Sequence, residues 1–476
     1  MKLHRLVFRL ATALPIWLSS FLSAQESSPP GDSATQGAGT PAADGAALSE
    51  RERQLLERIE TLERRMSELE GAASKSPAGA GVSPIGVSQT ALKTQSTSPA
   101  TSDPKPPTAE SGGSGASPNP EPFAFADFTW LTGNPRSKEF PLQGRVVTGE
   151  VRIDVDYVYD FNHPQDHTIS GSSEIFRSGE VQLTQFGLGG DLNWHNVRGR
   201  VMTQFGMYSQ TTPRNDASTG VGQWNLDGAY RYISEAYGGY HIDQWKGINV
   251  DAGIFMSYVG LFSYYQFDNW AYQPSYVSSN TPWFFNGVRI QIYPSDKLKI
   301  EPWFVNGWQS YGKFNDSPGV GMQVLWRPNG SLSVTSNNYI GKDALGVPGR
   351  KRVHTDDSVQ FKYLDLPGDF LDKGAATLTL DIGCEYGGGV SCSGGTRDRP
   401  SQYFLGFMAY NRFWFSNDQY AVTLGGGYIN NPGRYLVLLP PINGATALSG
   451  SPYFTESPGD PFRAWDYSVT FDYMPR

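Results

Sequence analysis

The sequence of 476 residues has few cysteines, few charged residues and no long hydrophobic run beyond its first segment. Two cysteines are too few for a disulfide scaffold or a four-thiolate zinc site. Only 18% of the residues are charged, and the formal net charge of -8 disfavours a nucleic-acid-binding protein. After residue 24 no apolar run approaches the roughly 20 residues of a transmembrane helix. The sequence therefore excludes helical membrane insertion.

Residues 1–24 have the pattern of an export signal. Three basic residues precede the apolar run 10–22, and Ser23 and Ala24 offer a small-residue cleavage site before Gln25. The apolar run is too short to span a bilayer. An amphipathic presequence or an ordinary buried helix is the alternative, but the residues that follow could not pack against such a helix. We therefore expect a signal peptide and an exported mature chain.

The next hundred residues predict linkers around one short helix. Residues 25–47 and 71–122 are dominated by Ser, Ala, Gly, Pro and Thr, and we predict that they are disordered. Residues 48–70 place apolar side chains in steps of three and four, which is the pattern of a coiled coil. So short a helix is unstable alone. We expect it to self-associate or to dock on another protein, with a single solvated helix as the alternative.

Residues 143–476 change to a hydrophobic period of two, which is typical of β-strands with one wet face. In the first segment, apolar residues from Val147 to Phe161 share one face, and Glu150 to Asn162 share the other. The connections between such segments alternate between short and long, which indicates about 14 strands, within a range of 12–16. The fold class predicted is all-β, a transmembrane antiparallel β-barrel.

Aromatic residues near the expected strand ends would suit girdles at the two membrane interfaces. The candidates are Tyr157, Tyr159, Trp283, Trp303, Trp308, Trp326, Trp414 and Trp465. An even number of strands places both barrel termini on the periplasmic side, so the N-terminal arm would lie in the periplasm. Residues 123–142 precede the barrel and are apolar enough to plug its mouth.

Residues 248–312 resemble the OmpL-like beta-barrel porin family of bacterial outer membranes. The most specific matches are Asn269-Trp270, Thr281-Pro282-Trp283 and Asn306-Gly307-Trp308-Gln309, and the likeness extends over about residues 123–476. The resemblance implies a pore-forming barrel without specifying its solute. The chain departs from the usual aromatic terminus by ending in Met474-Pro475-Arg476, which leaves Phe471 and Tyr473 for recognition by the barrel-assembly machinery.

The polar face of each strand would line a water-filled lumen. The candidate lining residues are Arg152, Asp154, Asp156, Arg231, Glu235, Arg289, Lys299, Glu301, Lys362, Asp381, Glu385, Asp466 and Asp472. For each of them the alternative is a solvated side chain without a role in selectivity. Residues 143–476 hold 31 acidic against 25 basic residues, so we expect a weak preference for cations.

The long connection at residues 259–281 is too apolar to stay in water. We predict that it folds into the lumen as a constriction loop containing Tyr264, Tyr265, Asp268 and Trp270. A packing role for Asp268, a sugar-binding track of stacked rings and a cover over a neighbouring subunit are the alternatives.

No residue pattern predicts catalysis, a cofactor or a metal site. Asp154 and Asp156 share a face without a substrate site, and His163 and His167 lack a third metal ligand. Cys384 and Cys392 flank a glycine-rich loop of an exported chain, so we expect a disulfide that staples this loop.

The function predicted is passive diffusion of small hydrophilic solutes or ions through an outer-membrane porin. The alternative is a plugged barrel that acts as an envelope tether or a surface binding protein. Expected partners are outer-membrane lipids, the barrel-assembly machinery and further copies of the chain, but no nucleic acid. Analogy with porins favours a trimer, whereas the heptad residues favour a dimer. The coiled coil could also contact the cell wall.

Overall fold

The computed structural model describes residues 64, 121–133, 141–164, 167, 169, 177–213, 216, 218, 221–344, 346–347, 349–396, 401–433 and 462–475. The predicted export signal, the first linker and nearly all of the coiled coil and second linker lie outside these residues. Arg64, in the predicted coiled coil, is helical and exposed. The chain divides into two units, Met1–Pro107 and Thr108–Arg476, and every described strand belongs to the second unit.

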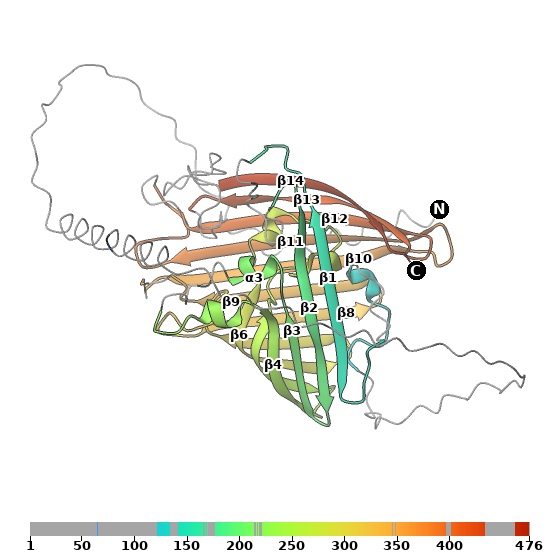
Figure 1. Cartoon of the computed structure of the whole chain (residues 1–476), viewed down its shortest axis with the longest axis horizontal. Helices are drawn as coiled ribbons and strands as arrows, with labels where there is room; N and C mark the ends of the chain where they lie inside the picture. The colour runs from blue at the N-terminus through green and yellow to red at the C-terminus, as the bar shows by residue number, and fades with distance from the viewer. Residues whose placement is uncertain are drawn as a thin grey trace, which may run out of the picture. The chain divides into compact units, whose positions relative to one another are not determined.

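Fourteen strands make up the sheet in the described part of this second unit (Figure 1). They are β1 (Val147–Tyr157), β2 (Val181–Trp194), β3 (Val197–Thr203), β4 (Ile233–Ile242), β5 (Ile248–Met256), β6 (Phe284–Ser295), β7 (Leu298–Val305), β8 (Gly319–Asn329), β9 (Leu332–Gly341), β10 (Lys351–Asp365), β11 (Leu371–Tyr386), β12 (Tyr403–Phe415), β13 (Tyr420–Asn431) and β14 (Phe462–Tyr473).

Each strand pairs antiparallel with the next one along the chain, from β1 to β14. No ladder between β14 and β1 is recorded in the described residues. In Figure 1 strands β1–β4 cross the view steeply, while β8–β14 run across it as the opposite wall. Short and long connections alternate along the whole sheet. The predicted fold class and the predicted number of 14 strands are confirmed.

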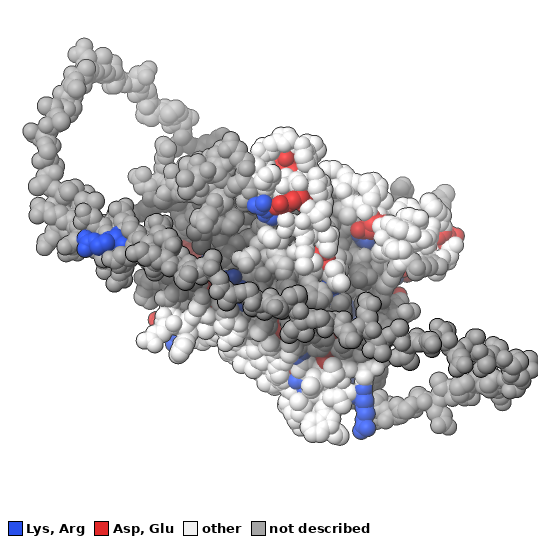
Figure 2. Space-filling view, in the orientation of Figure 1, with Lys and Arg blue, Asp and Glu red and all other residues white. Residues whose placement is uncertain are grey.

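The two faces of the sheet are reversed relative to a water-soluble protein. On β11, Leu378 and Leu380 are exposed, whereas the alternating Thr377, Thr379 and Asp381 are buried on the inner face. The same parity runs through the other strands, so apolar side chains face outward, as lipid contact requires. In Figure 2 the visible described surface carries only scattered charges.

Two predictions at the strand ends are wrong. The first strand ends at Tyr157 rather than continuing to Asn162. Among the expected girdle aromatics, Trp283, Trp303 and Trp308 are buried in internal clusters. Trp414 is also fully buried, in a third cluster. The exposed members are Tyr157, Tyr159, Trp326 and Trp465.

Five short helices lie in the described connections and the segment before the barrel. They are η1 (Thr129–Leu131), α3 (Tyr208–Thr211), α4 (Leu226–Tyr230), η3 (Gln266–Asp268) and α5 (Tyr276–Ser279). Within the described residues, no helix has the length and apolar character needed to cross a membrane.

Candidate functional site: the barrel lumen and its two inserted segments

The connection between β5 and β6, residues 257–283, crosses the inside of the barrel, and we call it the lumen loop. The Tyr272 hydroxyl donates to Asp154 on β1 over 2.9 Å. The Ser275 hydroxyl donates to Asp466 on β14 over 2.7 Å. Both acceptors lie on the inner face of their strands. The loop therefore bridges the first and last strands, between which no ladder is recorded in the described residues.

The second half of the lumen loop, from Trp270 through α5, packs against β12–β14. The side chain of Ser275 caps α5 by accepting from the Val277 backbone N–H. The α5 helix packs against β12, β13 and β14. Trp270 meets Trp414 edge to face at 5.6 Å between ring centroids, and both rings are fully buried.

Asp268 ties the tip of the lumen loop to β1. Its carboxylate lies 2.8 Å from a guanidinium nitrogen of Arg152. The same guanidinium lies over the ring of Tyr265 at 4.1 Å from its centroid. Burial raises the pKa of Asp268, and the charge of Arg152 opposes that increase. Burial also raises the pKa of Tyr272, so its hydroxyl stays protonated and donates to Asp154.

The aromatic residues predicted for the constriction are packed rather than open to the lumen. Tyr264, Tyr265 and Trp270 are all at least nine-tenths buried. Tyr208, in the connection between β3 and β4, stacks obliquely on Tyr264 at 4.5 Å between centroids. This second connection therefore also folds inward, onto the lumen loop. Ser310, in the β7–β8 connection, donates to its Asp216 over 2.9 Å. The packed rings offer no open track of the kind expected for sugar binding.

The segment before the barrel, residues 121–133, contacts the short-turn end of the sheet, and we call it the entry segment. The Phe123 backbone N–H donates to the Asp296 carbonyl in the β6–β7 turn over 2.9 Å. The Trp130 indole donates to the Gly330 carbonyl in the β8–β9 turn over 3.0 Å. Short turns are the periplasmic side of bacterial outer-membrane barrels.

The entry segment meets the tip of the lumen loop. The Gly133 N–H donates to the Asp268 carbonyl over 2.7 Å, and the Trp270 indole donates to the Trp130 carbonyl over 3.2 Å. A Cβ on Gly133 would lie 2.0 Å from the carbonyl oxygen of Asn269, so the contact requires glycine. Arg412 on β12 donates to the carbonyls of both Trp270 and Gly133. The two inserted segments are thus one connected barrier.

The inner wall differs in exposure from one side to the other. On β9–β12, Asp356 and Asp381 are fully buried. On β1–β4, Arg200 instead pairs with Glu150, Asp191 and Glu235 at 2.9, 3.1 and 2.7 Å, and Asp191 keeps 45% of its side chain exposed. The Arg200 network therefore keeps partly water-accessible charge on the β1–β4 side of the lumen.

Most predicted lining residues lie on the inner face of a strand and within an ion pair. Arg289 pairs with Asp251 at 3.0 Å and Lys299 pairs with Glu301 at 2.7 Å. Other recorded contacts are Glu235 with Arg200, Lys362 with Asp365, Asp381 with His354, Glu385 with Arg352 and Asp472 with Arg412. The assignment of Arg231 to a strand is wrong, because it caps α4 in the β3–β4 connection and pairs with Asp227.

Sequence reasoning missed several inner charges. Arg198 and Arg200 were not predicted, although they alternate with the outward Val197, Gly199 and Val201. Asp251 on β5 was also absent from the predicted lining residues, and it pairs with both Arg198 and Arg289. The alternation of residues along the short β3 strand would have been enough to predict that both arginines face the lumen.

Three predicted inner carboxylates stand apart from this paired set. No ion pair is recorded for Asp154, Asp156 or Asp466 within the described residues. Asp154 keeps one buried carboxylate oxygen without a hydrogen-bond partner there. On the basic side, Arg327 likewise has no recorded ion pair in the described part of the chain and lies over Phe123 and Phe128. The uncompensated inner charge at β1 and β14 is therefore negative.

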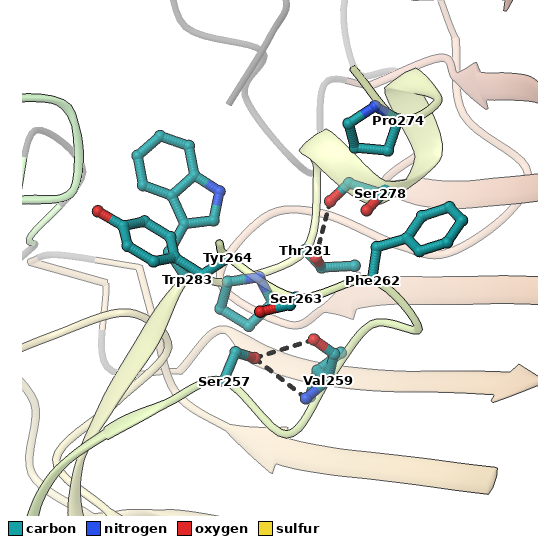
Figure 3. A pocket seen from close by; sticks show the side chains of 10 residues that line it. Ser257, Val259, Phe262, Ser263, Tyr264, Pro274, Ser278, Thr281 and Trp283 are labelled. Atoms are coloured by element: carbon teal, nitrogen blue, oxygen red, sulfur yellow. Dashed lines mark hydrogen bonds between the residues drawn. The ribbon is translucent and has the colours of Figure 1, made fainter. Parts of the chain in front are cut away.

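A small cavity lies within the lumen loop (Figure 3). Its volume of about 20 Å³ has room for one water molecule. The Thr281 hydroxyl donates to the Ser278 carbonyl over 2.7 Å at its edge. The cavity is too small for a solute, so it is not a candidate binding site.

Outside the lumen, Cys384 and Cys392 form a disulfide with Cα atoms 5.4 Å apart at the long-loop end of β11. In the part of the chain that the structure describes, no group of three or more His, Cys, Asp or Glu residues could hold a metal ion.

An antiparallel sheet with an apolar outer face and a polar, charged inner face defines an outer-membrane β-barrel of the porin type. The family model described as "Putative beta-barrel porin-2, OmpL-like" matches residues 147–476. The chain belongs to this family.

Similar solved structures are also outer-membrane proteins. OmpT of Vibrio cholerae is 8% identical with a TM-score of 0.35, covering 61% of this chain and 77% of that one. OprD of Pseudomonas aeruginosa is 9% identical with a TM-score of 0.29, covering 60% of this chain and 57% of that one. No curated protein matches.

Proposed function

We propose that the protein lets small hydrophilic solutes and ions diffuse passively across the outer membrane, without catalysis, a cofactor or energy coupling. The observation that carries this proposal is the charged wall of β1–β4, whose Arg200 network keeps water-accessible groups beside the inserted segments. Charged side chains that stay partly exposed to water are what the wall of a hydrated path requires.

The uncompensated carboxylates give the pathway a weak preference for cations. Asp154 and Asp466 accept hydrogen bonds from two nearby residues of the lumen loop, Tyr272 and Ser275. Fixed negative charge at a narrow point raises the local concentration of cations. The N-terminal arm, with its predicted coiled coil, would lie on the periplasmic side.

A second function has a specific observation in its favour. The entry segment and the lumen loop are joined through Gly133 and Trp270, and their shared cluster is fully buried. If this barrier seals the lumen, the barrel is a membrane anchor for the periplasmic arm or for a surface binding site. The two functions differ in what the barrier does to the flow of ions.

Deletion of residues 123–142 separates the two functions. An open pore should conduct in the full chain, and the deletion should change its single-channel conductance by less than about twofold. A plugged barrel should be silent until the deletion opens it. Swelling of liposomes in sugars and amino acids of increasing size then gives the solute limit. An intact chain that inserts but never conducts would reject the diffusion proposal.

A further inference from the structure

A block of four polar side chains interrupts the apolar outer face of the barrel. Its members are Ser336 and Asn338 on β9 and Thr355 and Asp357 on β10, and we call them the polar block. The register sets Asp357 opposite Ser336 and Thr355 opposite Asn338, so the four form one contiguous patch. All four are partly exposed.

Strand parity places the polar block on the outside. On β10, Val353 and Val359 share its face and are exposed, whereas the alternating His354, Asp356 and Ser358 are buried in the interior. On β9, Ile340 is exposed on the same face, and Asn337 and Tyr339 are buried on the other. The block therefore faces the surroundings of the barrel rather than its lumen.

The polar block also lies at mid-height. On β10 it is followed toward the short-turn end by Val359, Phe361 and Tyr363, which are exposed. Its lateral neighbours are apolar, because Asp357 is opposite Leu380 and Thr355 is opposite Ile382 on β11. On the other side, Ser336 and Asn338 are opposite Val324 and Met322 on β8.

Asp357 is the one charged residue that the described strands place on the outer face away from their ends. Lipid chains offer no hydrogen bonds, and ionisable groups in the hydrocarbon region are costly unless they find partners. The hydrogen bonds within the block run along each strand, from Thr355 to Asp357 over 3.1 Å and from Asn338 to Ser336 over 3.2 Å. They leave acceptor capacity on the Asp357 carboxylate and donor capacity on the Asn338 amide.

We propose that the polar block is the contact surface for a second copy of this chain, in a two-fold symmetric dimer. A two-fold contact brings the same patch of both copies together. The Asn338 amide and the two hydroxyls of one copy can then donate to the Asp357 carboxylate of the other. No cationic side chain on the described outer face lies at this depth, so neutral donors are the complement that the chain itself provides.

The predicted coiled coil is an independent indication of self-association, because its heptad pattern favours a pair of helices from two chains. The inference does not depend on the proposed diffusion function, since a plugged barrel could dimerise through the same block. Removal of the acceptor at position 357 should alter association without changing conduction through each barrel.

Cysteine crosslinking in lipid vesicles tests the dimer with the full chain. Val359→Cys places one thiol beside the polar block, and Leu424→Cys places a control thiol on the outer face of β13; both native residues are exposed. Cys384 and Cys392 are already joined, so the new thiol is the reactive one. We expect about tenfold more covalent dimer from Val359→Cys than from Leu424→Cys.

Two variants in the Val359→Cys background test whether the hydrogen-bond acceptor at position 357 is the cause. Asp357→Leu should lower the dimer yield about fivefold, whereas Asp357→Asn, which keeps an acceptor, should retain it within about twofold. Heat-dependent gel mobility confirms that each variant is folded. Equal crosslinking at positions 359 and 424, an unchanged yield with Asp357→Leu, or a monomeric mass for the full chain extracted from vesicles would overturn the proposal.

Discussion

Asp154 and Asp466 hold the lumen loop from two strands while lacking a recorded ion pair in the described part of the chain. We expect Asp154→Asn combined with Asp466→Asn to keep the hydrogen bonds from Tyr272 and Ser275 but to remove two negative charges. The ratio of cation to anion permeability should then fall, and the reversal potential in a salt gradient should move toward zero. Asp369→Asn, in the exposed β10–β11 turn, is the matched control. An unchanged reversal potential in the double variant would reject the role of these carboxylates.

Gly133 allows the entry segment to approach the lumen loop. Gly133→Val would place its Cβ 2.0 Å from the Asn269 carbonyl, so the segment must move away. We expect noisier single-channel conductance, increased by less than about twofold, with a barrel that still folds. Gly238→Val is the control, because a Cβ there meets nothing within 4 Å. Identical conductance for Gly133→Val and the wild type would mean that the contact does not limit the pore.

The alternation of polar and apolar residues along each strand was enough to assign many residues to the inner face. The prediction did not apply this alternation to every residue. Asp154, Glu301 and Asp381 were assigned to the lumen from alternation, and they lie on the inner face. Trp303 has the same parity as Glu301, yet its indole was assigned to a girdle. It packs inside because the lumen loop supplies an apolar partner, Tyr258, at 4.7 Å between centroids. That partner is distant in the sequence, so local composition could not reveal it.

The lumen loop is the element that ties the sheet across its first and last strands. Tyr272→Phe with Ser275→Ala would remove the donors to Asp154 and Asp466 and the side-chain cap of α5. Each lost hydrogen bond or cap should cost about 1 kcal/mol of stability. The temperature at which the folded band disappears in a heat-mobility gel should fall.

Tyr467→Phe on the outer face of β14 is the control for that pair, since no side-chain hydrogen bond is recorded for its hydroxyl within the described residues. If the double variant loses its folded band at the same temperature as the wild type, the loop does not stabilise the link between β1 and β14.

The apolar composition of the β5–β6 connection predicted that it would fold into the lumen. Composition alone could not predict which strands the connection would contact. The inward β3–β4 connection was missed altogether. Its anchors, Tyr208 and Tyr230, are separated by polar residues and give no local hydrophobic signal. They are buried or half-buried through contacts with Tyr264 and Tyr311, which belong to other connections.

Folding of the whole barrel into a membrane depends on the apolar outer face of the sheet. Leu380→Arg, at an exposed outer position of β11, should cost about 2–4 kcal/mol near the bilayer midplane and lower the yield of folding into vesicles. Gln182→Arg, on the inner face of β2, should fold with nearly wild-type yield. Equal yields for both variants would contradict the orientation of the sheet.

Strand number and fold class could be predicted from the sequence because short and long connections alternate throughout, a rule of the whole barrel rather than of any single strand. The relation between β1 and β14 could not be predicted in this way. It depends on strand tilt and stagger summed around the sheet, and on the lumen loop that joins Asp154 to Asp466 through contacts far apart in the sequence.

Single-channel recording of the purified full chain in a planar bilayer under a salt gradient tests the central claim most directly. A hydrated path along β1–β4, past the inserted segments and the unpaired carboxylates, predicts discrete conductance steps with a mild preference for cations. Stable insertion without any step would contradict this account and would identify the barrel as a sealed anchor.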